Sequence, residues 1–199
     1  MKARLLAVVL VIATPSAAGA EWQFRPFLGA TFGGGTTLVD LEHAVGAPNV
    51  ALGLSVVLIG EVVGVEADVA YGAGFFQSGD RHLVASSSAS TVTGNLVLAA
   101  PRRLTQYTLR PYFVGGGGMI RAGSEDFGGS LPYTSTLPAV DFGGGVTGFL
   151  TSRFGLSWDV RYFRSLGLKN SERGFSLGPE QLSFWRANMA LAIRLKRVP

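Results

Sequence analysis

Residues 154–162 read Phe-Gly-Leu-Ser-Trp-Asp-Val-Arg-Tyr, and the alternation of residue types in this stretch decides the fold. Successive side chains of an extended chain face opposite sides, so the aromatic and aliphatic residues of this stretch share one face. Asp159 and Arg161 lie on the other face, together with Gly155 and Ser157. The stretch therefore predicts a β-strand with one apolar face and one charged face.

The same two-sided pattern recurs along the chain of 199 residues. The predicted strands cover residues 22–34, 49–58, 62–74, 90–99, 108–122, 138–150, 154–166 and 183–195. The predicted long connections cover residues 35–48, 75–88, 123–136 and 167–181, and short turns lie between them. Alternating long and short connections between eight strands are typical of membrane-spanning β-barrels. We therefore predict an all-β, eight-stranded antiparallel up-and-down transmembrane barrel over residues 21–199.

The composition of the chain argues against a soluble enzyme or a nucleic-acid-binding protein. Only 15% of the residues are charged and the mean hydropathy is +0.32, whereas soluble domains have about 25% charged residues. The chain contains no cysteine, which excludes disulfides, thiolate metal sites and a catalytic thiol. Basic residues do not cluster beyond a pair such as Arg102-Arg103, so we expect no nucleic-acid partner. We also expect no cofactor and no metal site.

The first 20 residues have the pattern of a cleavable export signal. Lys2 and Arg4 precede an apolar run at residues 5–13, and residues 18–20 read Ala-Gly-Ala. The apolar run is shorter than the ~20 residues that a spanning helix needs, so an N-terminal membrane anchor is the weaker alternative. We predict a signal peptide at residues 1–20 and location in the outer membrane of a Gram-negative bacterium.

The two faces of the strands need different surroundings. A soluble barrel would show the same alternation with its faces reversed, but the polar face has few lysines and many small residues, which suits a crowded interior. We predict that eight aromatic residues face lipid: Trp22, Phe24, Phe32, Tyr71, Phe154, Trp158, Tyr162 and Trp185. We predict that a network of paired charges fills the interior: Arg25, Glu66, Asp68, Arg110, Asp141, Asp159, Arg161, Arg186 and Arg194.

Several stretches resemble the eight-stranded outer-membrane β-barrel family that is related to the OmpA transmembrane domain and OmpX. These stretches are residues 22–34, 110–118, 141–145 and 154–162. The resemblance covers essentially the whole chain after residue 20. It implies the barrel fold and the outer-membrane location rather than an activity.

We weighed three functions. The leading hypothesis is a monomeric, non-enzymatic surface scaffold for adhesion, surface recognition or envelope integrity, because a rigid barrel presents its loops to the environment. Its expected partners are outer-membrane lipid, lipopolysaccharide and an extracellular ligand that binds the four long connections. The first alternative is a porin-like channel for small solutes or hydrophobic molecules. The second is a lipid-modifying enzyme, for which His82 near Asp80 and residues 86–88 is the best candidate, although an exposed polar loop explains these residues more simply.

Overall fold

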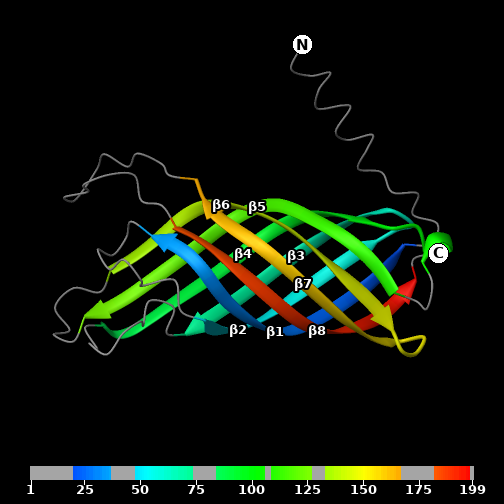
Figure 1. Cartoon of the computed structure of the whole chain (residues 1–199), viewed down its shortest axis with the longest axis horizontal. Helices are drawn as coiled ribbons and strands as arrows, with labels where there is room; N and C mark the ends of the chain where they lie inside the picture. Colours follow the sequence, from blue (N-terminus) through cyan, green and yellow to red (C-terminus); the bar gives the residue numbers. More distant parts are fainter. Residues whose placement is uncertain are drawn as a thin grey trace, which may run out of the picture.

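The structure is a computed structural model that describes residues 20–36, 48–73, 84–105, 109–126, 133–166 and 182–197. Its strands are β1 (Glu21–Thr36), β2 (Asn49–Ile59), β3 (Val63–Ala73), β4 (Val84–Ala99), β5 (Leu109–Asp126), β6 (Tyr133–Phe149), β7 (Phe154–Ser165) and β8 (Leu182–Arg197). Each strand pairs antiparallel with its sequence neighbours, and β8 pairs with β1 to close the sheet (Figure 1). The predicted eight-stranded antiparallel up-and-down barrel is therefore confirmed. Among the described residues, no helix is long and apolar enough to cross a membrane.

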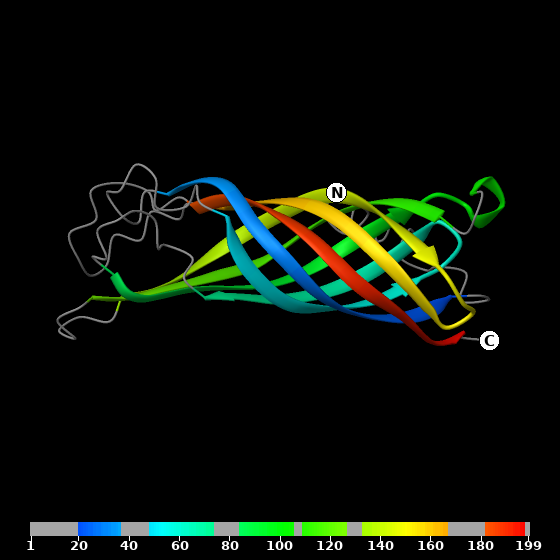
Figure 2. The same cartoon turned by 60° about the horizontal axis from the view of Figure 1, so that its bottom comes forward.

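The barrel has two different ends. Short connections join β2 to β3, β4 to β5 and β6 to β7 at one end, which we call the turn end. The connection between β4 and β5 contains the short 3-10 helix η1 (Arg102–Leu104). β1 begins and β8 ends at the turn end, on the right in Figure 1. At the opposite end, which we call the loop end, the segments 37–48, 74–83, 127–132 and 166–181 connect the strands. Three of them are longer than any turn-end connection, whereas 127–132 is shorter than the connection between β4 and β5. Figure 2 shows from a second direction that the strands are inclined to the long axis of the barrel.

Several strands extend further toward the loop end than the sequence predicted. β4 begins at Val84, β5 continues to Asp126 and β6 begins at Tyr133. The predicted connections 75–88 and 123–136 were thus wrong at residues 84–88, 123–126 and 133–136, and the predicted connection 35–48 was wrong at residues 35–36. Serine and glycine in these stretches resemble loop composition, but the backbone groups pair across the strands whatever the side chain.

Two of the predicted segments cannot be compared with the structure. The predicted signal peptide lies outside the described residues except for Ala20, which directly precedes β1. The predicted connection 167–181 lies wholly outside them, as do the candidate catalytic residues Asp80 and His82.

A bulge changes the register between β1 and β8 near the loop end. Phe32 pairs with Trp185, but the next recorded pair is Gly35 with Ser183. Gly33 lies between these pairs and has a φ of 53°, in the left-handed region that glycine adopts with least strain. An inserted residue in this conformation bends a strand and increases its twist. Gly33 therefore shapes the last part of β1.

Two glycines lie on the inner face of β5 where it pairs with β4. Inward positions of β5 carry Arg110, Tyr112 and Val114 and then Gly116 and Gly118. A Cβ atom on Gly118 would lie 1.9 Å from the carbonyl oxygen of Val92 on β4. No larger residue fits there unless the strands move apart, so this glycine permits the close approach of β4 and β5.

Candidate functional site

Side chains fill the barrel in three layers. The layer nearest the turn end combines a cluster of apolar residues with buried polar ones. The apolar cluster is Val57, Ile59, Val97, Ala99, Tyr112 and Val114, and the buried polar residues are Glu21, Gln23, Arg25 and Arg110. The layer nearest the loop end is apolar: Ala89, Ile120, Ala122, Leu137, Ala139, Phe163, Leu182 and Phe184. Between them lies a charge layer, which we define as Glu66, Asp68, Asp141, Asp159, Arg161 and Arg186. All six side chains are buried, so the charges of this layer must be compensated by protein groups.

Arg161 on β7 is the centre of the charge layer. Its guanidinium donates to Glu66 on β3 through both terminal nitrogens, and Nη2 lies 3.2 Å from Glu66 Oε2. Its Nε donates to Asp159 Oδ1 at 2.9 Å, and Nη1 lies 3.8 Å from Asp68 Oδ2. Only 1% of Arg161 is exposed, so these carboxylates replace the hydration that the guanidinium loses on burial. Arg161 thereby ties β7 to β3 across the interior.

Arg186 on β8 forms the second ion pair of the layer. Its Nη2 donates to Asp68 Oδ1 at 2.7 Å, and its Nη1 donates to the hydroxyl of Thr91 at 3.1 Å. The guanidinium carbon also lies 4.9 Å from the ring centre of Phe27 and 4.6 Å from that of Phe163. Contact with two aromatic rings is a favourable environment for a desolvated guanidinium. Arg186 therefore joins the charge layer to the apolar layer at the loop end.

Neutral groups complete the hydrogen bonding of Asp159. The hydroxyl of Tyr112 donates to Asp159 Oδ2 at 2.9 Å, and Asn188 Nδ2 donates to Oδ1 at 2.7 Å. The hydroxyl of Ser157 lies 3.2 Å from the Tyr112 hydroxyl and 2.9 Å from that of Thr147. These bonds link β5, β6, β7 and β8 into one polar network.

Asp141 on β6 differs from the other carboxylates of the layer. It is 2% exposed, yet neither of its carboxylate oxygens has a hydrogen-bond partner among the described residues. Its register neighbours are Gly116 on β5 and Phe163 on β7, neither of which carries a polar side chain. The layer contains four carboxylates and two guanidinium groups, so Asp141 is the least compensated charge in the interior.

Three of the predicted interior charges lie at the turn end instead of in the charge layer. Arg110 donates to the backbone oxygens of Ala100, Gly60 and Glu61 at 2.9, 3.0 and 2.7 Å, so it fastens two turns together. Arg194 Nε lies 2.7 Å from Glu21 Oε2, and Arg25 donates to Gln23 Oε1. This turn-end cluster closes the barrel separately from the charge layer.

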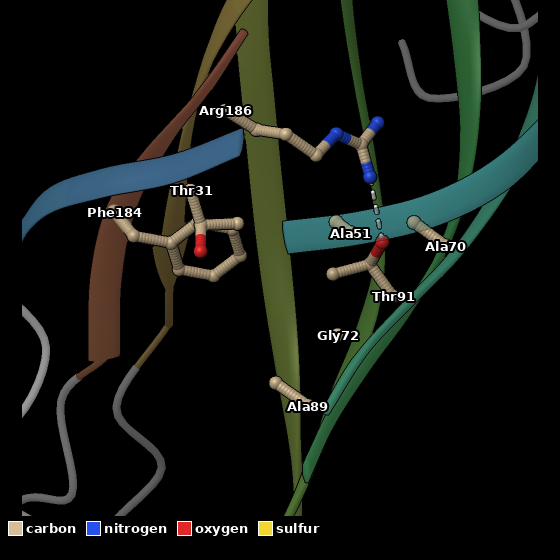
Figure 3. A pocket seen from close by; sticks show the side chains of 8 residues that line it. All are labelled: Thr31, Ala51, Ala70, Gly72, Ala89, Thr91, Phe184 and Arg186. Atoms are coloured by element: carbon tan, nitrogen blue, oxygen red, sulfur yellow. Dashed lines mark hydrogen bonds between the residues drawn. The ribbon is translucent and has the colours of Figure 1, made fainter. Parts of the chain in front are cut away.

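A small cavity lies on the loop-end side of Arg186 (Figure 3). Its volume is about 10 Å³, which is close to the minimum that holds one water molecule. The lining residues are Thr31, Ala51, Ala70, Gly72, Ala89, Thr91, Phe184 and Arg186. Alanine and glycine on β2, β3 and β4 face Phe184 and Arg186 on β8, and Figure 3 shows the Arg186–Thr91 hydrogen bond beside the cavity. The cavity is too small for a metabolite or a lipid chain.

The outer face of the barrel is apolar. Six of the predicted lipid-facing aromatic residues are exposed: Trp22, Phe32, Tyr71, Phe154, Trp158 and Trp185. The other two, Phe24 and Tyr162, are half-buried on the same face. The rings of Phe142, Tyr162 and Trp185 lie side by side on β6, β7 and β8, with centres 5.4 and 5.0 Å apart. The structure also exposes many aliphatic residues on this face, including Leu52, Val69, Leu96 and Leu191.

The sequence analysis missed four aromatic residues that point inward: Phe27, Tyr112, Phe163 and Phe184. The alternation itself contained the signal, because Tyr112, Phe163 and Phe184 are each two positions from an inward arginine on the same strand. The sequence analysis assigned none of these four residues to a face, although the strand phase gives their direction. Among the described residues, no group of three or more His, Asp or Glu side chains is arranged to hold a metal.

Comparisons with known proteins bear on the fold. No family model matches the chain, and no curated protein matches its sequence. The structure is similar to Neisserial surface protein A, with a TM-score of 0.65 and 14% identity, over 89% of this chain and 99% of that chain. It is less similar to the N-terminal β-barrel domain of Pseudomonas aeruginosa OprF, with a TM-score of 0.49 and 13% identity, over 89% of this chain and 99% of that chain. At sequence identities this low, structural similarity shows a shared fold and nothing more. The chain therefore shares its barrel architecture with Neisserial surface protein A.

Proposed function

We propose that this protein is a monomeric outer-membrane barrel that acts as a closed, non-enzymatic scaffold for its loop-end segments. The observation that carries the proposal is the contrast between the two faces of the sheet. Charged side chains are buried inside, while residues such as Leu52, Leu96 and Trp158 are exposed outside. Hydrocarbon is the environment in which this arrangement is stable, since a closed barrel leaves no unpaired backbone edge in lipid.

The distribution of aromatic residues supports the same proposal. Trp22, Phe24, Phe154 and Trp158 lie within the first residues of their strands at the turn end, whereas Phe32 and Trp185 lie near the loop end. Aliphatic residues occupy the outer face between these two groups. Membrane barrels have an apolar band about 25 Å tall between two aromatic girdles. The shared fold of Neisserial surface protein A is consistent with this assignment.

The filled interior argues for a scaffold rather than a channel. Among the described residues, buried side chains occupy all three layers, and the cavity beside Arg186 has a volume of about 10 Å³. An eight-stranded barrel has room for side chains but not for an open aqueous path as well. We therefore propose that the segments 37–48, 74–83, 127–132 and 166–181 carry the biological role, as surface recognition, adhesion or envelope integrity. The expected surroundings are outer-membrane lipid and lipopolysaccharide.

The three tryptophans allow a direct test, because all three lie on the outer face. The protein is folded into bilayers whose acyl chains carry bromine, and tryptophan fluorescence is compared with that in unbrominated bilayers. We expect strong quenching, and slower gel migration after boiling than before it. Fluorescence unaffected by bromine would favour a soluble barrel with water on its outer face. Large, steady single-channel currents would refute the closed scaffold and favour the channel.

A further inference from the structure

Two arginines stand out on the outer face. Of the outward strand positions between residues 22 and 195 whose side chains the structure describes, only Arg121 on β5 and Arg164 on β7 are charged. Both are exposed, and neither has a hydrogen-bond or ion-pair partner among the described residues. A cation on a surface that contacts lipid is costly unless an anion pairs with it. The two arginines therefore need a partner that the described chain does not supply.

Both arginines lie at the same end of the barrel. Arg121 is 12 positions beyond Leu109, where β5 begins at the turn end, and Arg164 is 10 positions beyond Phe154, where β7 begins. The strand between them is β6, where Arg121 pairs with Thr136 and Arg164 with Val140. Four residues along β6 and two strand spacings correspond to about 13 Å and about 10 Å, so the two Cα atoms are about 16 Å apart.

An apolar surface lies next to this arginine pair on the turn-end side. Tyr162 precedes Arg164 by two residues and lies on the same face, and its ring contacts those of Phe142 and Trp185. The outward residue on β6 opposite Arg164 is Val140. A molecule with an anionic headgroup and acyl chains would place the headgroup at the arginines and the chains over these rings.

We propose that Arg121 and Arg164 bind the phosphate groups of a phosphorylated glycolipid, namely lipopolysaccharide in the outer leaflet. Guanidinium groups suit phosphate because they donate two parallel hydrogen bonds to it. Two separated arginines fit a headgroup with two phosphates better than a phospholipid with one. A scaffold that presents its loop-end segments at the cell surface has its loop end in the outer leaflet, so this inference rests on the proposed function.

The test uses purified barrel in detergent micelles and three probes: diphosphoryl lipid A, lipid A without phosphates, and phosphatidylglycerol. The unfolding midpoint of the barrel is measured as each probe is added. We expect diphosphoryl lipid A to raise the midpoint of the wild type. The double variant Arg121→Gln/Arg164→Gln should need about thirtyfold more of it, since each basic side chain at a membrane surface contributes about sixfold. The Arg→Lys double variant should recover part of the effect, because the charge remains without the paired donors.

The matched control is Arg103→Gln/Arg153→Gln, which removes two exposed arginines at the turn end. It should respond to diphosphoryl lipid A as the wild type does. An unchanged response in the Arg121→Gln/Arg164→Gln variant would overturn the site, as would an equal response to lipid A without phosphates. An equal response to phosphatidylglycerol would overturn the choice of glycolipid. If bromine quenches the tryptophans but the lipid A responses are absent, only this inference is overturned. If bromine does not quench them, the proposed function is overturned as well.

Discussion

Replacement of Arg161 by leucine removes the central cation of the charge layer. The variant leaves Glu66 and Asp159 without the guanidinium from which both accept hydrogen bonds, and it removes the positive charge 3.8 Å from Asp68. Removal of one partner from a buried ion pair costs about 3–5 kcal/mol, because the remaining charge stays buried without compensation. We expect Arg161→Leu to lower the free energy of unfolding by at least this amount.

Urea unfolding in detergent micelles measures this loss, with the change of gel mobility on unfolding as the readout. With a urea slope of about 2–3 kcal/mol per molar, the midpoint should fall by about 1–2 M. Arg153→Leu is the control, since Arg153 is exposed in the turn between β6 and β7, and its midpoint should stay close to that of the wild type.

A second measurement shows whether Arg161→Leu destabilises the barrel through lost charge pairing or through changed side-chain volume. If uncompensated carboxylates cause the defect, removal of one of these carboxylates should reduce it. The double variant Arg161→Leu/Glu66→Leu should therefore lose less free energy of unfolding than the two single losses combined. A midpoint equal to that of the control at neutral pH would refute the role of Arg161 described here.

Three further variants test other parts of the structure by the same unfolding assay. Asp141→Asn should raise the free energy of unfolding by about 1–3 kcal/mol, since it removes a buried charge without hydrogen-bond partners in the described chain; a lower midpoint would show that the carboxylate is compensated. Gly118→Ala should destabilise the barrel by about 1–3 kcal/mol, because the added Cβ would overlap the carbonyl oxygen of Val92. Gly94→Ala is the control and should be nearly neutral, since a Cβ at this position would have no atom within 4 Å. Equal midpoints for the two variants would contradict the overlap. Arg110→Met should cost about 1–3 kcal/mol and speed proteolysis near Leu104, because three carbonyl oxygens in two turns lose their donor; unchanged proteolysis would argue against Arg110 as the link between these turns.

The alternation along 154–162 and its recurrence predicted the strands, because a period of two assigns every residue of a strand to one side of the sheet. The number of strands and the lengths of their connections then predicted the barrel. The period-two rule was not applied to Phe163 and Phe184, which the sequence analysis left unassigned and whose phase places them inside. The ends of β4, β5 and β6 were missed for another reason. Strand pairing near Ser87 and Ser124 depends on backbone hydrogen bonds, which serine and glycine provide as well as any residue.

The arrangement of the charges inside the barrel could not be predicted from the sequence. Alternation gives the side of the sheet but not which carboxylate lies within reach of which guanidinium. Arg161 and Glu66 are separated by 95 positions in the chain and meet only because the closed sheet brings β7 and β3 face to face across the interior. The separation of Arg110 and Arg194 from the charge layer likewise follows from the height of each residue along its strand.

Pairing of β1 with β8 closes the sheet, and this has a consequence for biogenesis. Until the β8 residues have been synthesised, the preceding strands cannot form a closed cylinder. Any sheet formed earlier has two unpaired edge strands and an exposed apolar face, and this combination promotes aggregation. A chaperone that keeps such a chain unfolded would prevent its strand edges from pairing with other chains until β8 can pair with β1.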